Sequence, residues 1–285
     1  MTLVPKMYAY LKATRLIICL CAGLMALEGY WLSVHRFDLS GWPPVLVALA
    51  VGSGLAFANV LNDILDRKAD QVNHPHRPIA SGKVKPIEAA CLASALLAVS
   101  LLSAFFAGWR VFLLASAVLA LSVVYNVWAK KVPVLGNFLV ALSGALILAT
   151  GAFVTSQGEL PIFPMLAALL FILAREFLET VSDAPGDQLA GRNSVATRFG
   201  KARVLQACLA LTLLTAVVLV APALALDNPA SRFLYLATLA FISVLPGSVF
   251  VAAVWRDPSL PNIESVTYKT RALLFSSLIV FLWLV

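Results

Sequence analysis

Acidic residues of this 285-residue chain gather in two short segments, and the first of them has helical spacing. Asp63, Asp66 and Asp70 lie three and four residues apart, so their carboxylates would project from one face of a helix. Because like charges one helical turn apart repel each other, such a group is unfavourable unless a cation binds it. The spacing therefore predicts a cation-binding surface within residues 62–70.

The second acidic segment covers residues 179–187 and repeats this arrangement further along the chain. Glu179 and Asp183 lie four residues apart, again on one helical face. Pro185 predicts that the helix ends near residue 184, which would leave Asp187 on the following turn but close in space. Arg175 precedes Glu179 by four residues and offers a simpler alternative, in which Glu179 only forms an ion pair along the helix.

Carboxylates in such groups suit a hard cation such as Mg²⁺, which characteristically binds one or two carboxylates together with phosphate oxygens. Two acidic segments facing each other across one cavity would hold several Mg²⁺ ions on a diphosphate. Cationic side chains are available nearby for the remaining phosphate charge, namely Lys68, Arg77, Lys130 and Arg192. The residues by themselves thus point to a metal-dependent diphosphate site.

The elements that must position these segments are membrane helices, since 61% of the residues are hydrophobic and only 12% are charged. A soluble domain is about 45–50% apolar and about 25% charged, so a soluble enzyme is excluded. A helix needs about 20 apolar residues to cross a bilayer. The sequence predicts an all-α polytopic protein, a single domain over residues 1–285 with nine transmembrane helices around a central cavity. The apolar stretches are about 15–33, 44–64, 87–108, 111–129, 134–155, 161–183, 204–226, 231–254 and 267–285.

The distribution of Lys and Arg predicts how these helices are oriented. Apart from Arg175 inside the sixth stretch, only Arg36, Arg110 and Arg232 fall on the side opposite the N-terminus. The positive-inside rule then places the N-terminus and both acidic segments on the cytoplasmic side of the inner membrane. The basic residues of these loops account for the formal net charge of +7. Nucleic acid is not expected as a partner, because no basic patch contains interleaved aromatic residues.

Both acidic segments resemble motifs of the UbiA-type superfamily of intramembrane prenyltransferases. The first family motif, N-D-x-x-D-x-x-x-D, is matched without departure at Asn62, Asp63, Asp66 and Asp70, and residues 77–82 resemble its R-P-[IL]-x-x-G continuation. The second motif, D-x-x-G-D followed by G-R, is matched at Asp183, Gly186, Asp187, Gly191 and Arg192. A further Tyr/Lys element is resembled by Tyr125 and Lys130. The resemblance covers nearly the whole chain, including the nine-span layout.

The resemblance implies an enzyme that binds an isoprenyl diphosphate through Mg²⁺ and transfers the prenyl group to an acceptor, with release of diphosphate. The acceptor would be a lipophilic molecule reached through the membrane lipid, carrying an aromatic, quinone-type or hydroxyl group. The metal would neutralise the charge that develops on the diphosphate as the allylic C–O bond breaks. An apolar tunnel between the helices would hold the prenyl chain and exclude water from the carbocation.

The resemblance also implies a role for each candidate residue. The metal ligands would be Asp63, Asp66, Asp70, Asp183 and Asp187. The substrate contacts would be Asn62, Lys68, Arg77, Tyr125, Lys130 and Arg192. Arg15 is a candidate for acceptor binding, with anchoring at the membrane surface as the alternative. Glu179 is a candidate for acceptor binding or proton removal, and with Asp63, Asp66, Asp183 and Asp187 it completes the expected catalytic group.

Two other functions fit parts of this pattern. A terpene cyclase of the same architecture would ionise the same diphosphate and let the carbocation attack its own chain, so the motifs do not separate it from a transferase. A transporter with a divalent-cation site would place acidic residues near the middle of the membrane, whereas these acidic segments lie toward one face. The first loop and the D-x-x-G-D form are closer to family members that use glycerol-phosphate or reduced-quinone acceptors than to those that use 4-hydroxybenzoate.

Overall fold

The computed structural model describes residues 3–156, 158–189, 191 and 193–285, and the regular elements within these ranges are all helical. The α-helices are α1 (Leu3–Thr14), α2 (Leu16–Val34), α3 (Pro43–Leu65), α4 (Arg67–Asn73), α5 (Pro86–Ala107), α6 (Trp109–Val127), α7 (Leu135–Ala152), α8 (Ile162–Leu189), α9 (Val195–Phe199), α10 (Lys201–Val220), α11 (Pro229–Thr238), α12 (Leu245–Arg256) and α13 (Leu260–Val280). The shorter elements are the 3₁₀-helices η1 (Ala129–Lys131), η2 (Ala221–Ala225) and η4 (Phe281–Leu284), and the π-helical η3 (Leu239–Val244). The predicted all-α fold is confirmed.

Seven helical stretches among the described residues are long and apolar enough to cross a membrane. They are α2, α3, α5, α6, α7 and two composite stretches, Lys201–Ala225 and Pro229–Arg256. The other two predicted spans correspond to α8, with 28 residues, and α13, with 21 residues, whose apolar sequence is interrupted by charged side chains. A multi-pass membrane protein is confirmed, whereas the count of nine spans stays a prediction.

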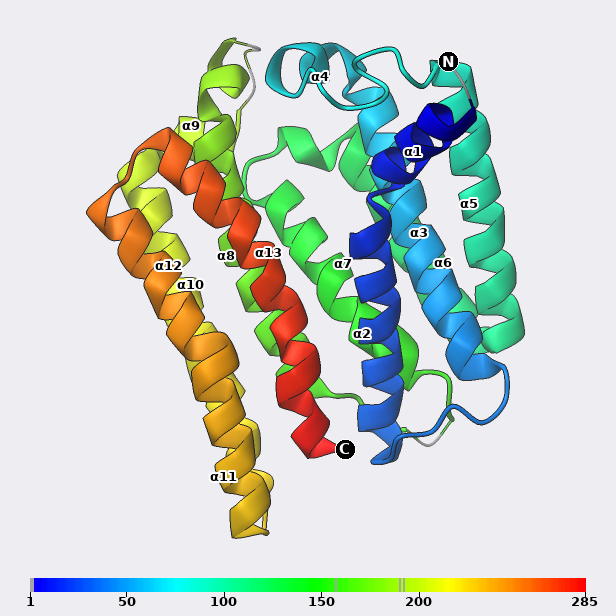
Figure 1. Cartoon of the computed structure of the whole chain (residues 1–285), viewed down its shortest axis with the longest axis vertical. Coiled ribbons are helices and arrows are strands. Elements are labelled where there is room, and N and C mark those ends of the chain that lie inside the picture. Colours follow the sequence, from blue (N-terminus) through cyan, green and yellow to red (C-terminus); the bar gives the residue numbers. More distant parts are fainter. Residues whose placement is uncertain (1–2, 157, 190, 192) are drawn as a thin grey trace.

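The long helices lie side by side, and α1, α4 and α9 lie at one end of the molecule (Figure 1). The helix α3 packs against α2 and α5, α7 packs against α2 and α8, and α8 packs against α10 and α13. Small residues permit the closest of these approaches, because a side chain at Gly29 would overlap the backbone of Leu148 and one at Gly151 would overlap that of Ala26. Close packing of this kind is a main source of helix association in lipid.

The chain changes direction at two residues that lead into the site. Arg15, between α1 and α2, has left-handed backbone angles of φ 55° and ψ 50°, which residues other than glycine rarely adopt. Asp66, between α3 and α4, has φ −90° and ψ 4°. The first acidic segment is therefore divided, with Asp63 near the end of α3 and Asp70 within the short helix α4.

The prediction that Pro185 ends a helix near residue 184 is wrong, because α8 continues to Leu189 with this proline inside it. A proline within a helix removes one backbone hydrogen bond and costs about 3 kcal/mol. The packing of α9, α10 and α13 against α8 offsets this cost. As a consequence, Asp183 and Asp187 lie four residues apart on one continuous helical face, not on successive pieces of chain.

Candidate functional site

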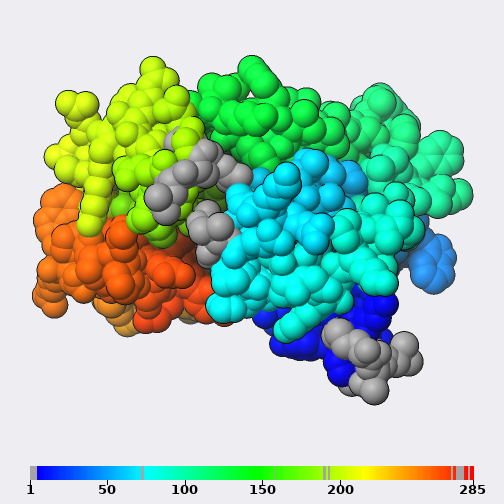
Figure 2. Space-filling model, turned by 90° about the horizontal axis from the view of Figure 1, so that it is seen from above, coloured from blue at the N-terminus to red at the C-terminus, as the bar shows by residue number. Residues whose placement is uncertain are grey.

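A cavity of about 810 Å³ lies between α2, α3, α5, α6, α7 and α8. One end is lined by carboxylate, guanidinium, ammonium and amide side chains. This polar end lies where α4 and α8 meet. Figure 2 views the molecule from the end that carries α1, α4 and α9. The rest of the lining is largely small or apolar and includes Ala22, Met25, Val51, Leu55, Leu119, Ile147 and Ile172. One continuous space thus joins a charged mouth to an apolar chamber.

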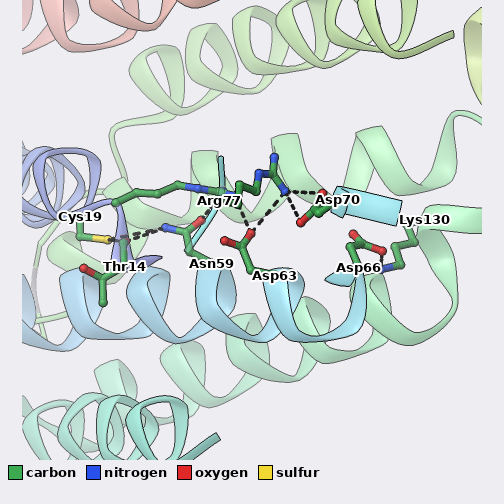
Figure 3. A network of polar contacts seen from close by, with 9 residues as sticks. Thr14, Cys19, Asn59, Asp63, Asp66, Asp70, Arg77 and Lys130 are labelled. Atoms are coloured by element: carbon green, nitrogen blue, oxygen red, sulfur yellow. Dashed lines mark hydrogen bonds and ion pairs between the residues drawn. The ribbon is translucent and has the colours of Figure 1, made fainter. Parts of the chain in front are cut away.

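Two arginines hold the carboxylates of the first acidic segment in place (Figure 3). The Asp63 side chain is buried and lies 2.9 Å from Arg15 Nη2 and 3.3 Å from Arg77 Nη1. Arg77 also donates to both oxygens of Asp70, at 2.9 and 2.8 Å. Arg77 therefore ties the end of α3 to α4. Asp70 lines the cavity, whereas Asp63 lies behind the lining.

The third carboxylate of this segment, Asp66, is held by a cation from the connection between α6 and α7. Lys130, in η1 after α6, places its Nζ 2.7 Å from Asp66 Oδ1 (Figure 3). Both residues line the cavity, together with Asn62 on α3 and Tyr125 near the end of α6. The Lys68 side chain is exposed and is not part of the cavity lining. A cation thus reaches the mouth from the α6–α7 connection, and the exposed lysine of α4 does not.

The second acidic segment forms a stripe along α8. Glu176, Glu179, Asp183 and Asp187 follow at intervals of three, four and four residues, and all four side chains line the cavity. This spacing keeps them on one face of the helix. The continuation of α8 past Pro185 is what brings Asp187 into this stripe. The cavity therefore has carboxylates from α3 and α4 on one side and from α8 on the other.

An ion group lies at the deep end of the stripe. Arg175 Nη1 donates to Glu179 Oε2 at 2.8 Å, and Arg175 Nη2 donates to Glu176 Oε1. All three side chains line the cavity, and that of Arg175 also lines a smaller, mostly apolar cavity of about 80 Å³ between α8, α10, α12 and α13. The alternative expectation for Glu179, an ion pair with Arg175, is thus present in the structure, but within the cavity wall.

Most of the predicted site residues meet in this one cavity. Ten of them line it: Arg15, Asn62, Asp66, Asp70, Arg77, Tyr125, Lys130, Glu179, Asp183 and Asp187. Asp63 lies directly behind the lining, and Lys68 lies outside it. Arg192 falls outside the residues that the structure describes. The chemical role of each residue stays a prediction.

The sequence pattern did not reveal every polar group of the site. Asn59 accepts from Arg15 at 2.9 Å and donates to the Thr14 carbonyl at 3.1 Å, so it fixes the junction of α1 and α2. Its position four residues before Asp63 in α3 was a usable signal for a shared helical face. Lys131, in the three-residue helix η1, and Asn137, in the first turn of α7, also line the cavity, but neither position carries a periodic signal.

His74 is a site residue outside the spanning helices whose surroundings shift its pKa. This side chain follows α4 and lines the cavity. Burial lowers the pKa of the His74 imidazole, and the nearby Arg77 cation acts in the same direction. The imidazole is therefore neutral at pH 7 and does not add to the cations that face the mouth.

The fit of the site to a metal ion depends on what the ion brings with it. Among the described residues, no three His, Cys, Asp or Glu side chains converge closely enough to hold a metal alone. Magnesium usually takes only one or two carboxylates and completes its shell with water and phosphate oxygens. The facing pairs Asp66 and Asp70, and Asp183 and Asp187, supply hard oxygen ligands of this kind. The donor set therefore fits Mg²⁺ bound together with a phosphate group.

Comparison with known proteins agrees with the fold and the motifs. The model of the UbiA prenyltransferase family matches residues 15–283. The digeranylgeranylglyceryl phosphate synthase of Methanoculleus marisnigri is 33% identical over 190 residues, which cover 66% of this chain and 67% of that protein.

Solved structures share the architecture. A structure of a digeranylgeranylglyceryl phosphate synthase superimposes with a TM-score of 0.73 and 25% identity, covering 97% of each chain. A UbiA homologue from Archaeoglobus fulgidus, bound to GPP and Mg²⁺, superimposes with a TM-score of 0.72 and 20% identity, covering 95% of this chain and 99% of the other. The second likeness supports the fold alone.

Proposed function

This chain belongs to the UbiA prenyltransferase family, and we propose that it transfers a prenyl group from an isoprenyl diphosphate to the hydroxyl group of a glycerol-phosphate-type lipid. The observation that carries the proposal is the single cavity in which carboxylates of two elements face each other above an apolar chamber. Such a cavity has one region suited to a charged head group and another suited to a hydrocarbon chain. An isoprenyl diphosphate consists of these two parts.

The charged mouth would bind the diphosphate. Lys130, Arg77 and Asn62 offer cationic or amide donors to phosphate oxygens, and the Tyr125 hydroxyl lies on the same lining. Asp66, Asp70, Asp183 and Asp187 would hold Mg²⁺, and Asp63 would orient Arg15 and Arg77, with its own binding of metal still a prediction. When bound, Mg²⁺ neutralises the negative charge of the leaving diphosphate.

The apolar chamber would hold the prenyl chain. Its lining combines small residues such as Ala22 and Gly54 with larger ones such as Met25 and Leu119. Exclusion of water from this space protects an allylic carbocation from hydrolysis and strengthens the electrostatic interactions at the mouth. The chain length is therefore expected to depend on the side chains at the deep end of the chamber.

The acceptor class rests on the relatives and on the motif form. The relative from Methanoculleus marisnigri is named for a product in which prenyl groups are joined to glyceryl phosphate. The D-x-x-G-D motif at residues 183–187 is of the form expected for such acceptors. Arg15 lines the cavity where α1 meets α2 and would contact the acceptor's phosphate or its glycerol oxygens.

The membrane orientation follows from charge. The end that carries α1, α4 and α9 is also the end at which most Lys and Arg residues lie. The positive-inside rule favours a cytoplasmic position for this end. The diphosphate would then enter the mouth from the cytoplasm, and the acceptor would enter from the lipid. The chain would act as one domain.

The test is a product assay with purified protein in detergent. Labelled geranylgeranyl diphosphate and Mg²⁺ are supplied with or without geranylgeranylglyceryl phosphate, or with a reduced quinone precursor in its place. The proposal expects a lipid product only with the glycerol-phosphate acceptor. Product with the quinone precursor alone would overturn the acceptor class. A cyclic hydrocarbon or alcohol formed without any acceptor would establish the terpene cyclase alternative instead.

A further inference from the structure

The ion group of Arg175, Glu176 and Glu179 forms part of the cavity wall. One guanidinium is shared by two carboxylates, on Glu176 and on Glu179. The Glu179 side chain is 33% exposed, against 12% for Glu176 and 16% for Arg175. Glu179 is therefore the member of the group that is most open to the cavity.

The position of the group along α8 places it below the diphosphate mouth. At 1.5 Å per residue, Glu179 lies roughly 6 Å and Glu176 roughly 10 Å along the helix axis from Asp183. The direction is away from Asp187 and toward the apolar chamber. The diphosphate lies at the level of Asp183 and Asp187 in the proposed function, so the allylic carbon would lie near the level of Glu179.

A group of charged side chains is costly to keep within a membrane helix, even when its members form ion pairs. The carboxylates of Glu176 and Glu179 also face Tyr125 of α6, which is close enough to interact with both electrostatically. Ionisable residues that line an intramembrane cavity are functional candidates for this reason.

We infer that Glu179 accepts the proton of the acceptor hydroxyl, and that Arg175 and Glu176 position it. This inference rests on the proposed transfer to a hydroxyl acceptor. The bond between prenyl C1 and the diphosphate oxygen breaks first, and its electron pair leaves with the diphosphate. The acceptor oxygen then donates an electron pair to the allylic cation and forms the new bond to C1. The hydroxyl proton moves to the Glu179 carboxylate and passes later to solvent at the mouth. Arg175 fixes the side chain through Nη1, while Glu176 takes the other guanidinium nitrogen.

The test separates ionisation of the diphosphate from capture by the acceptor. Glu179→Gln, Glu176→Gln and the control Glu159→Gln, in the exposed segment before α8, are compared by two readouts. These are diphosphate release and the ratio of acceptor product to prenyl alcohol. In Glu179→Gln, acceptor product should fall about 100-fold or more, the usual contribution of a general base. Diphosphate release should stay within about twofold, with prenyl alcohol replacing the lipid product.

Glu176→Gln tests the positioning role, because it leaves Glu179 in place. Acceptor product should fall about tenfold with a matching rise in prenyl alcohol, and Glu179→Asp should restore part of the activity lost in Glu179→Gln. Equal losses of product and diphosphate release in both glutamine variants, or unchanged product in Glu179→Gln, would overturn the inference. Failure of the proposed function looks different, since wild-type protein would then form no product that depends on a glycerol-phosphate acceptor.

Discussion

The two acidic sides of the cavity differ in how their charge is balanced. On the side of α3 and α4, each of Asp63, Asp66 and Asp70 has a cationic partner within 3.3 Å. On the side of α8, the charged groups that act on Asp183 are mostly carboxylates, with Arg77 as the cation among them. The first side is held rigid by its own ion pairs. On the second side, Glu176 and Glu179 pair with Arg175, whereas Asp183 has mostly carboxylates around it and has more to gain from a metal ion.

This difference suggests a division of labour. The first side would be preorganised and would set the position of the diphosphate. Its ion pairs with Arg77 and Lys130 connect α3, α4 and η1. The second side would bind the metal more strongly, since a bound cation relieves repulsion between side chains that share one helix face. Preorganised groups cost little at the moment of reaction, whereas the carboxylate stripe becomes favourable only with its cation.

The largest expected effect is on the α8 side. Asp187→Asn should lower prenyl transfer by about 100- to 1000-fold, the range seen when one electrostatic partner of a transition state is lost. The concentration of Mg²⁺ needed for half-maximal activity should rise as well. Initial rates at several Mg²⁺ concentrations measure both effects. Asp227→Asn, in the loop before α11, is the matched control and should behave as wild type.

The next effect is on stability and belongs to the α3–α4 side. Arg77→Ala should destabilise the protein by about 3 kcal/mol, because it leaves the buried Asp63 and Asp70 carboxylates facing each other without their shared cation. Thermal unfolding in detergent measures this change. Arg36→Ala removes a guanidinium from an exposed pair with Asp38 and should leave the unfolding temperature nearly unchanged. A similar loss of stability in both variants would mean that Arg77 contributes no more than an exposed ion pair.

A smaller effect should distinguish the two lysines of the mouth. Lys130→Ala removes the cation that faces Asp66 and should raise the KM for the isoprenyl diphosphate about tenfold, by loss of one charged contact. Lys68→Ala should change the KM by less than about twofold, because this side chain is exposed and does not line the cavity. Steady-state kinetics with varied isoprenyl diphosphate concentration measure the KM of both variants. A larger effect at Lys68 would restore the sequence-based expectation that it contacts substrate.

The smallest effect concerns the placement of Arg15. Helix α1, which leads into Arg15, is tied to α5 by the pair of Lys6 Nζ and Glu88 Oε1 at 2.6 Å. Such accessible ion pairs contribute little, so Lys6→Ala should change activity by less than about twofold. Acceptor-dependent rates measure this. A large loss would show that the docking of α1 controls the first side of the cavity.

Much of the site could be predicted from spacing alone. Helical periodicity identified the shared face of Glu179 and Asp183, because side-chain direction within one helix depends only on residue number. It was wrong for Asp63, Asp66 and Asp70, because the chain breaks at Asp66 and places Asp63 on α3 and Asp70 on α4. The apolar stretches located the helices α2, α3, α5, α6 and α7 to within a few residues, since length and hydropathy are local properties. The same reasoning predicted a common cavity, because both segments fall at the ends of predicted spans on the same predicted side.

The remainder depended on tertiary contacts that no local pattern records. The course of α8 through Pro185 follows from packing against three other helices, which outweighs the local cost of proline. The exposed position of Lys68 and the position of Lys130 in the cavity lining depend on where the short helices α4 and η1 are placed. Asp63 forms ion pairs with Arg15 and Arg77, which are distant in sequence from each other.

The most direct test of the account measures binding of a non-hydrolysable isoprenyl thiolodiphosphate to the purified protein by calorimetry. Wild-type protein is titrated with Mg²⁺ and with a chelator, beside Asp66→Asn and Asp187→Asn. The two-sided cavity predicts binding that needs Mg²⁺ and is weakened at least tenfold by either substitution. Equal binding in the chelator, or full binding in both variants, would contradict a diphosphate held by metal between the two acidic sides.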